Sequence, residues 1–555
     1  MKRILAILLI AILILSLFAC NSDTSVDTGT PVSGGDTSPT TSSAATPGSS
    51  PSQQTTPPSN NGGEAANGDK EIAASPDGVE YGGVMRVITT SEGAQPIGVP
   101  WEVTGVDANL QIPTIESVIS QKLNGEVVPV LAESVVEDYE NLKIIITVRQ
   151  NVDFIDGSHL NAEVVAWNYE MSKEANRFST QVTDIEVTGE YEVVLHLEAY
   201  TNEIIGVLSG NGIISKESFE KNGIEWARDN PVGTGAFKLS EFVRGSHISY
   251  VRNDNYWQPG KPYLDGMEYV FIRDVMTQNI AMQSTGTQSI DVLNSTNSEQ
   301  IVLMRQMGYN VVTIPIGPTS LIPSSKVEGS PLADLRVRQA ISYAIDRDAL
   351  VAARGFGLLQ PAGQIVSDLY PAYLPESYTL TYDLDKAKEL MIEAGYPDGF
   401  STTLIGQPGL ADRDMVVAMQ AMLARIGITA AVEFPDSGGY AAIRTAGWDG
   451  FLVAHIRSMT NIGRTFHNVF GPFAASNSAM WKPDGLEDLI LLTAALPIGE
   501  NTQALLDTHK MVLDNMVAIP VVYLYDAWIS KSNLHGAGFG EWATFRPADA
   551  WFSSD

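Results

Sequence analysis

The sequence predicts a mixed α/β protein of two to four domains. Its 555 residues exceed what one simple core usually organises, and an apolar content of 44% is typical of a globular chain. Strand-like runs and helix-like apolar stripes follow one another without a regular strand-helix repeat and without a solenoid period. This mixture favours an α+β or mixed α/β body.

The charge balance is strongly acidic, with 34 Lys and Arg against 65 Asp and Glu and a net charge of −31. A surface of this sign repels phosphate backbones, so nucleic acid is not an expected partner. The seven histidines are scattered and form no His-x-x-x-His pair. The sequence therefore predicts neither a bound metal nor a cofactor.

An enzyme is not predicted, because the sequence lacks the short motifs of nucleophile elbows, zinc proteases and phosphate loops. The single cysteine, Cys20, also rules out an intramolecular disulfide and a cysteine nucleophile in the body. Paired carboxylates of the kind that hydrolyse glycosides stay open as an alternative, since acidic residues are abundant.

The N-terminus has the pattern of an export signal. Lys2 and Arg3 precede an apolar run from Ile4 to Leu15, which is shorter than the roughly 20 residues of a membrane span. The following sequence, Leu17-Phe18-Ala19-Cys20, resembles the bacterial lipoprotein box, in which the cysteine is lipidated. We expect a signal peptide over 1–20 and lipidation at Cys20; an uncleaved anchor and an ordinary secretory cut are the alternatives.

A segment rich in Ser, Thr, Pro and Gly follows over 21–78. It cannot bury enough apolar surface to offset chain entropy, so we expect a disordered tether. The body would then lie outside the cytoplasm, anchored by lipid to the cell membrane, at the cell surface or in a periplasm.

The first half of the body alternates between strands and helices. A turn and a strand are expected over Tyr81–Ile88. The remaining elements expected in this half are a helix over Ile112–Leu123, a strand over Leu142–Arg149, a helix over Ala162–Ala175 and a strand over Glu192–Glu198.

The stretch from Pro231 to Asp274 combines a Gly-rich turn with three strands. Gly233 and Gly235 flank Thr234, and glycine lets a backbone approach another chain closely. An ordinary turn before a strand explains the same pattern. The strands are expected over Phe237–Val243, His247–Val251 and Met267–Arg273.

The second half is richer in helices. Asp334 can cap a helix that runs to Ile345, and Asp383 or Asp385 can cap another over Lys386–Ala394. A third is expected over Asp414–Ile426 and a strand over Ile428–Phe434. Gly395 and Gly427 are expected to end the second and third helices in the left-handed conformation.

Six motifs in order carry a resemblance to a known family. They are Val130–Ser134, Val148–Glu163, Pro231–Arg273, Ser289–Val292, Asp334–Arg347 and Tyr382–Pro397. Together they resemble the family 5 extracellular solute-binding proteins, the dipeptide, oligopeptide and nickel-binding group that delivers ligands to ABC importers.

The resemblance implies a two-lobed periplasmic-binding-protein-like clamp with an extra domain inserted in lobe I. It would bind a peptide-like or other organic solute between the lobes, as a monomer, and deliver it to an ABC permease and ATPase. A ligand-sensing or adhesive surface lipoprotein with the same clamp is the alternative. The implied segments are 79–120, 228–325 and 520–555 for lobe I, 121–227 for the inserted domain and 326–519 for lobe II.

In peptide-binding members of the family, an acidic residue after the strand at Gly447–Val453 binds the peptide ammonium group. The matching stretch here, Ala454–Arg464, has no carboxylate. An ammonium group buried without a partner costs several kcal/mol, so ordinary peptide binding is not expected. Arg457 or Arg464 can instead bind a carboxylate or phosphate; surface salt bridges are the alternative.

Three aromatic positions complete the predicted site. His455 stands where relatives have an aromatic lining residue, with a metal ligand or a core histidine as alternatives. Trp101 and Trp448 are candidates for the walls of the ligand cleft, because indoles give large and rigid contact surfaces. Core packing explains them equally well. Gly233, Thr234 and Gly235 are expected at the return of the chain from the inserted domain to lobe I.

Overall fold

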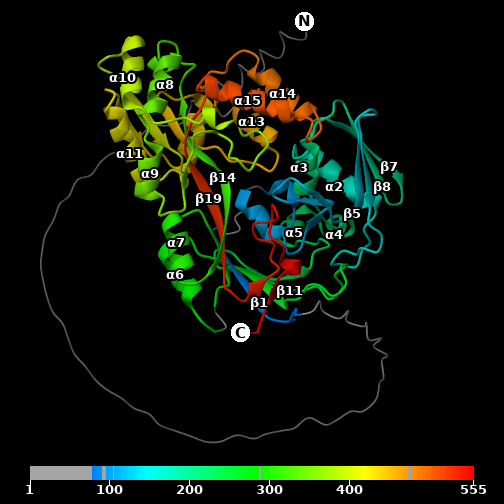
Figure 1. Cartoon of the computed structure of the whole chain (residues 1–555). Coiled ribbons are helices and arrows are strands. Elements are labelled where there is room, and N and C mark those ends of the chain that lie inside the picture. The colour runs from blue at the N-terminus through cyan, green and yellow to red at the C-terminus, as the bar shows by residue number, and fades with distance from the viewer. Residues whose placement is uncertain (1–77, 91–95, 104, 287–288, 473–476, 555) are drawn as a thin grey trace, which may run out of the picture. The chain divides into compact units, whose positions relative to one another are not determined.

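The computed structural model describes residues 78–90, 96–103, 105–286, 289–472 and 477–554 (Figure 1). The predicted signal peptide, the lipidation site Cys20 and nearly all of the tether lie outside these residues. Glu71–Asp555 form a unit of their own. In the described part of the chain, no helix is both long enough and apolar enough to cross a bilayer.

One large mixed sheet runs through the body in the order β10-β11-β12-β1-β13-β19-β14-β18-β16-β17, and β15 pairs with β19. Its strands are β1 (Val84–Thr89), β10 (Phe237–Val243), β11 (His247–Arg252), β12 (Gly266–Phe271), β13 (Val292–Ser295), β14 (Asn310–Pro323), β15 (Gln360–Pro361), β16 (Ser401–Gly406), β17 (Thr429–Glu433), β18 (Phe451–His455) and β19 (Ile519–Ser530).

Strands β14 and β19 join the two halves of this sheet. They are antiparallel and paired from Asn310 opposite Ser530 to Leu321 opposite Ile519. The Ser530 end of β19 pairs with β13, whereas the Pro323 end of β14 pairs with β18. Figure 1 shows the two strands side by side through the middle of the body. Both halves are therefore tied to one continuous hydrogen-bonded ladder.

A second, four-stranded sheet has its own core. Its order is β5-β6-β8-β7, and Val165 and Tyr169 of helix α2 pack with Ile144 and Ile146 of β6 in that core. The strands are β5 (Ala132–Asp138), β6 (Lys143–Val148), β7 (Val182–Gly189) and β8 (Glu192–Leu197), and α2 covers Ala162–Glu174. This body corresponds to the predicted inserted domain, whose boundaries stay a prediction.

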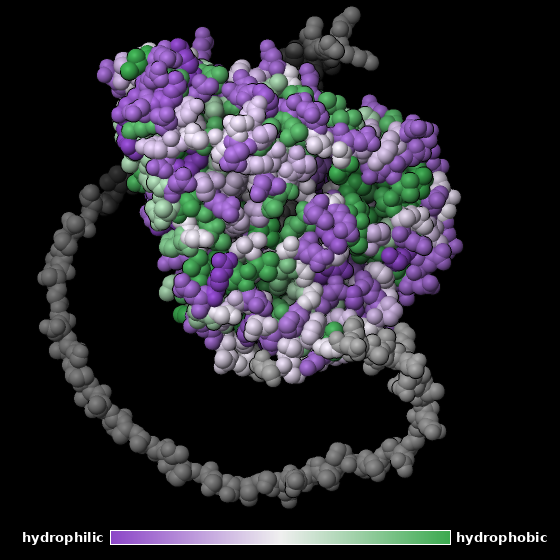
Figure 2. All heavy atoms as spheres, viewed as in Figure 1, coloured by the Kyte–Doolittle hydropathy of each residue, from purple (hydrophilic) through white to green (hydrophobic). Residues whose placement is uncertain are grey.

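The remaining helices surround the two sheets. They are α3 (Ile204–Gly210), α4 (Lys216–Asn222), α5 (Ile224–Asp229), α6 (Val275–Gln283), α7 (Ser298–Gln306), α8 (Leu335–Ala344), α9 (Arg347–Arg354), α10 (Leu384–Glu393), α11 (Arg413–Ala424), α12 (Ser437–Ala446), α13 (Ile462–Phe470), α14 (Leu486–Ala495) and α15 (Thr502–Asp514). Figure 2 shows polar residues covering α10 and its surroundings, while apolar residues gather nearer the middle of the same face.

Asp334 is confirmed as the predicted N-terminal cap of the first helix in the second half. The Asp334 carboxylate accepts a hydrogen bond from the Arg336 N–H at the start of α8. Asp383, rather than Asp385, caps α10. Gly395 and Gly427 follow α10 and α11 with φ of 88° and 82°, the left-handed conformation that glycine adopts without strain. Helix α11 begins earlier than expected, because Asp412 caps it.

The predicted helix over Ile112–Leu123 is wrong. This segment contains two short strands, β2 (Glu116–Ser117) and β3 (Ile119–Gln121). Strand β2 pairs with β9 (Gly212–Ile213), and β3 pairs with β4 (Val127–Pro129). The apolar spacing suits either structure, and pairing with distant strands decides between them.

The Gly-rich turn is a place of close backbone approach. Added Cβ atoms at Gly233 and Gly235 would lie 2.1 Å from the Thr114 carbonyl oxygen and 2.5 Å from the Pro113 carbonyl oxygen. The Gly235 N–H donates to the Thr114 carbonyl at 2.9 Å. Side chains at either position would displace the backbone before β2. The turn's part in the hinge stays a prediction.

Side chains of the same motif, Pro231–Arg273, donate hydrogen bonds to a buried carboxylate outside it. Glu116 on β2 accepts hydrogen bonds from Thr234 Oγ1 at 2.8 Å, Tyr256 OH at 2.7 Å and Trp257 Nε1 at 2.8 Å. Burial raises the pKa of Glu116, although these three bonds and the charge of Arg546 oppose the shift. The motif residues Thr234, Tyr256 and Trp257 therefore hold β2 in place through Glu116.

We predict that Gly235→Ala lowers the free energy of unfolding by about 1–3 kcal/mol, because its methyl group meets backbone that cannot move freely. Urea denaturation would measure the change. Gly210→Ala is the matched control, since a Cβ there meets no atom within 4 Å, and its stability should stay equal or rise slightly. Equal stabilities of the two variants would contradict the close-approach argument.

Candidate functional site

The end of β18 and the residues that follow it run beside β14 and carry two of the predicted site residues, His455 and Arg457. His455 lies opposite Thr319 of β14, and the Ser458 N–H donates to the Ile316 carbonyl at 2.7 Å. Because side chains alternate along an extended segment, His455 and Arg457 share one side of it. The approach requires Gly317, whose φ is 112° and whose added Cβ would lie 2.0 Å from the Ile456 carbonyl oxygen.

His455 is held neutral at pH 7. Both ring nitrogens are buried, and neither has a hydrogen-bond partner among the described residues. Burial, with a smaller contribution from the positive charge of Arg457, lowers the pKa of His455 to about 4. A neutral imidazole can donate one hydrogen bond and accept another. This side chain is therefore available to a polar ligand group.

Asp526 supplies a carboxylate that the local sequence of Ala454–Arg464 lacks. It lies on β19 and accepts a hydrogen bond from Asn294 Nδ2 of β13 at 2.8 Å. Burial raises the pKa of Asp526, while the Asn294 bond and the charge of Arg457 lower it. The sequence signal that could have revealed this residue is an Asp within a strand that is otherwise almost entirely apolar. Acidic side chains are seldom buried unless they are paired.

The charge of Arg457 acts on both His455 and Asp526. Its exposed guanidinium also lowers the pKa of Tyr370, which burial raises. We call His455, Arg457, Asp526, Asn294 and Tyr370 the junction cluster. It combines a cation, an anion and neutral hydrogen-bonding groups from both halves of the large sheet.

The other predicted ligand residues lie elsewhere. Arg464 of α13 contacts the inserted domain, since a Cβ on Gly206 would lie 2.7 Å from its Nη1 atom. Trp101 is 5% exposed and packs edge-on against Trp167 and Phe219. Trp448 is equally buried and donates from Nε1 to the Ile322 carbonyl at 3.3 Å. Ligand contact by these three residues stays a prediction.

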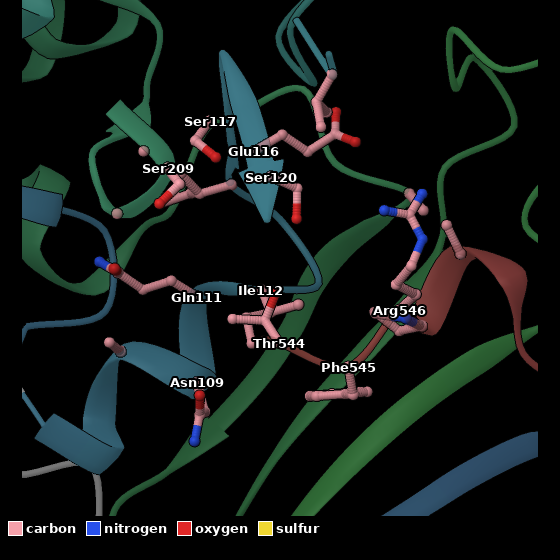
Figure 3. Close-up of a pocket in the computed structure, with 18 of the residues that line it drawn as sticks. Asn109, Gln111, Ile112, Glu116, Ser117, Ser120, Ser209, Thr544, Phe545 and Arg546 are labelled. Carbon is pink, nitrogen blue, oxygen red and sulfur yellow. The ribbon is translucent and has the colours of Figure 1, made fainter. Parts of the chain in front are cut away.

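A cavity of about 230 Å³ is lined by residues from 108–130, 209–212 and 544–548, together with Ala236 and Tyr256, and by no residue of the junction cluster. Figure 3 shows Ser117, Ser120 and Ser209 along one wall and Ile112 and Phe545 along the other. At one side the Glu116 carboxylate and the Arg546 guanidinium extend toward each other. The cavity has the size and mixed lining that suit a small polar molecule or water.

Metal binding finds no support in the described ranges. No group of three or more His, Cys, Asp or Glu side chains there is placed to hold a metal ion.

A sheet divided into two halves, bridged by two long strands and accompanied by an inserted domain, defines the two-lobed fold of solute-binding proteins. Residues 126–477 match the family model described as bacterial extracellular solute-binding proteins, family 5 Middle. The chain belongs to this family. The resemblance of the six motifs and the predicted mixed α/β, two-lobed class are confirmed.

Curated relatives include the glutathione-binding protein GsiB of Salmonella typhi, 32% identical over 323 residues, and that of Escherichia coli O157:H7, 30% identical over 322 residues. Each match covers 56% of this chain and 62% of the relative. The chain therefore matches less than two thirds of the length of these relatives.

Solved structures share the fold over most of both chains. DppA from Helicobacter pylori in complex with the peptide STSA is 21% identical, with a TM-score of 0.70, over 86% of this chain and 99% of that one. CtaP from Listeria monocytogenes is 20% identical, with a TM-score of 0.74, over 86% and 100%. NikA from Brucella suis in complex with Fe(III)-EDTA is 20% identical, with a TM-score of 0.73, over 84% and 98%.

We predict that Arg457→Gln raises the pKa of both His455 and Asp526, because the guanidinium charge disfavours the imidazolium and favours the carboxylate. The histidine midpoint should rise from about 4 toward the ordinary 6.5. NMR titration of the two side chains measures both shifts. In the control Arg464→Gln, both midpoints should stay as in the wild type; a similar rise there would contradict the specific role of Arg457.

Proposed function

We propose that this protein captures a peptide-like or other small organic solute between its two lobes and delivers it to an ABC importer. It acts as a binding protein without a reaction of its own. Membership of the solute-binding family supports this role, and so does the name of the curated relatives, which are glutathione-binding proteins. The junction cluster is the observation that carries the proposal.

The cluster fits a solute with both a carboxylate and an ammonium group. Arg457 offers a planar fork of N–H donors for a carboxylate, and Asp526 offers a carboxylate for an ammonium group. Asp526 also removes the reason for excluding ordinary peptides, because the counter-charge comes from β19 rather than from Ala454–Arg464. Glutathione and other short peptides carry this combination of charges.

The site has a physical reason to favour a charged solute. Asp526 is partly buried and the charge of Arg457 lowers its pKa, so the two groups interact in surroundings where the interaction between charges is stronger than in water. A zwitterion can satisfy both residues at once, whereas a neutral solute would desolvate them without replacing their partners. We therefore expect binding to depend on both groups.

We predict that Asp526→Asn and Arg457→Gln each weaken the binding of glutathione or a short peptide by about 10- to 100-fold. This range corresponds to about 1.5–3 kcal/mol for a hydrogen bond to a charged group. Isothermal titration calorimetry would measure the affinities, beginning with solutes that mass spectrometry finds in the purified protein. Arg305→Gln on the exposed face of α7 is the control.

The outcome can separate ligand classes. Wild-type binding that both variants leave unchanged would contradict the junction cluster as the binding site. Binding of a purely neutral solute in preference to peptides would contradict the charge argument. Peptide binding without importer-dependent uptake would favour the sensing or adhesive alternative.

We also propose that the protein is an extracytoplasmic lipoprotein, held at the membrane through Cys20 and the following tether. The position of the cysteine after an apolar run supports this proposal. We predict that cells expressing the wild-type chain incorporate labelled palmitate into it and that Cys20→Ser abolishes this labelling. Equal labelling of both proteins would contradict lipidation at Cys20.

A further inference from the structure

The inserted domain contacts the second half of the body through the segment just before and within α3. The Asn202 side chain is 1% exposed. Its Nδ2 donates to the carbonyls of Thr493 and Leu496, each at 2.7 Å, and its Oδ1 accepts from Asn461 Nδ2 at 2.8 Å. The Asn202 N–H donates to the Ala494 carbonyl at 2.8 Å.

These side-chain bonds use both N–H donors of the Asn202 amide and one of the two lone pairs on its oxygen. Thr493, Ala494 and Leu496 lie at the end of α14, where carbonyl groups have no partner inside the helix. Asn202 therefore caps a helix end of another domain. The Thr493 carbonyl also accepts a hydrogen bond from Asn501 Nδ2 at 2.9 Å.

A second contact lies beside the first. The Glu203 Oε1 atom is 2.7 Å from His467 Nδ1 of α13, and each side chain is 21% exposed. The hydrogen bond to Glu203 raises the pKa of His467, and the nearby positive charge of Arg464 opposes the shift. Arg464 itself lies against Gly206 of α3.

All of these contacts join α3 and the two residues before it, in the segment predicted as the inserted domain, to α13, α14 and the adjacent Asn461. The helices α13 and α14 belong to the same half of the body as β18. The two halves are linked by β14 and β19, so a rotation about these strands would break the contacts together. A rotation that opens the two halves about β14 and β19 would exchange these contacts for water.

We propose that Asn202, together with Asn461, Thr493 and the Glu203–His467 pair, forms a latch by which the inserted domain holds the second lobe closed. The latch regulates access to the solute site and so rests on the proposed function. Its hydrogen bonds all join protein groups to one another, so it acts without contact with the solute. A solute that favours the closed form then needs less differential affinity to stabilise it.

The latch is strengthened by acid. Since the contact raises the pKa of His467, the closed form favours the imidazolium. This contribution is fully present below the ordinary histidine pKa of about 6.5 and is lost as the pH rises through the raised value. Glu203 from the start of α3 and Arg464 from α13 are the charged groups that act on His467.

The latch can be tested without a solute. The chain has a single cysteine, so a full-length Cys20→Ser protein in detergent can carry one dye pair at Val187→Cys and Leu491→Cys. These positions are 40% and 44% exposed and lie on β7 and α14. Single-molecule fluorescence transfer then reports the ratio of closed to open molecules.

We predict that the ligand-free parent populates the closed distance and that Asn202→Ala lowers the closed-to-open ratio by about 10-fold. Asn461→Ala should act in the same direction from the other side of the contact. The double variant should lose less than the product of the single effects, because both substitutions break one shared bond. Thermal unfolding checks that the variants stay folded at the temperature of measurement.

Matched variants serve as controls. Asn222→Ala removes an amide that bonds only to the Ser218 carbonyl within α4, and its ratio should equal that of the parent. In the parent the closed fraction should fall between pH 5.5 and 8.5, whereas Glu203→Gln should reduce that dependence.

Two results would overturn the latch: ratios within twofold of the parent in both Asn202→Ala and Asn461→Ala, or a parent that shows only the open distance. Because no solute is added, a failure of peptide binding would reject the proposed ligand and leave the latch standing.

Discussion

The antiparallel pairing of β14 with β19 is the constraint on which the rest of this structure depends. The ladder crosses from one half of the large sheet to the other, and residues Ile316–Pro323 and Ile519–Tyr523 are buried along it. Its register shifts near Pro315–Gly317 and again at Thr319–Ser320. Such irregularities bend a strand and increase its twist. The β14–β19 ladder therefore joins the two halves of the sheet, and it is irregular at two places along its length.

This ladder also assembles the junction cluster. Asp526 lies on β19 itself and Asn294 on its neighbour β13. His455 ends β18 beside β14, and Arg457 follows two residues later. A change in the relation between the halves would therefore change the spacing of the anion and the cation. Charge complementarity to the solute and the geometry of the lobes are coupled through the same strands.

The motifs that identify the family serve the scaffold in this chain. Thr234, Tyr256 and Trp257 bind the Glu116 carboxylate, and the glycines beside Thr234 admit the backbone of Pro113 and Thr114. This anchor holds β2, which lies just before the segment predicted as the inserted domain, against the chain that returns after that segment. Asn202, within the segment predicted as the inserted domain, also contacts the end of α14. That segment therefore contacts both halves of the body.

The sequence by itself determined the mixed α/β class, the family and most of the helices and strands in order. It also located Asp334, Asp383, Gly395 and Gly427 at helix ends, because a cap depends on hydrogen bonds and φ angles within a few residues. It indicated Arg457 and His455 as candidates through the position of their segment after a buried strand.

Only the tertiary structure decided the partners of these residues. The segment Ile112–Leu123 forms strands because β4 and β9 pair with it. The charge of Arg457 acts on Asp526 because β19 returns to the sheet after a long excursion of the chain. Asn202 meets α14 for the same kind of reason. The local sequence determines which hydrogen bonds and backbone angles a residue favours. Its partners in the fold depend on pairing between distant segments, which the local sequence does not specify.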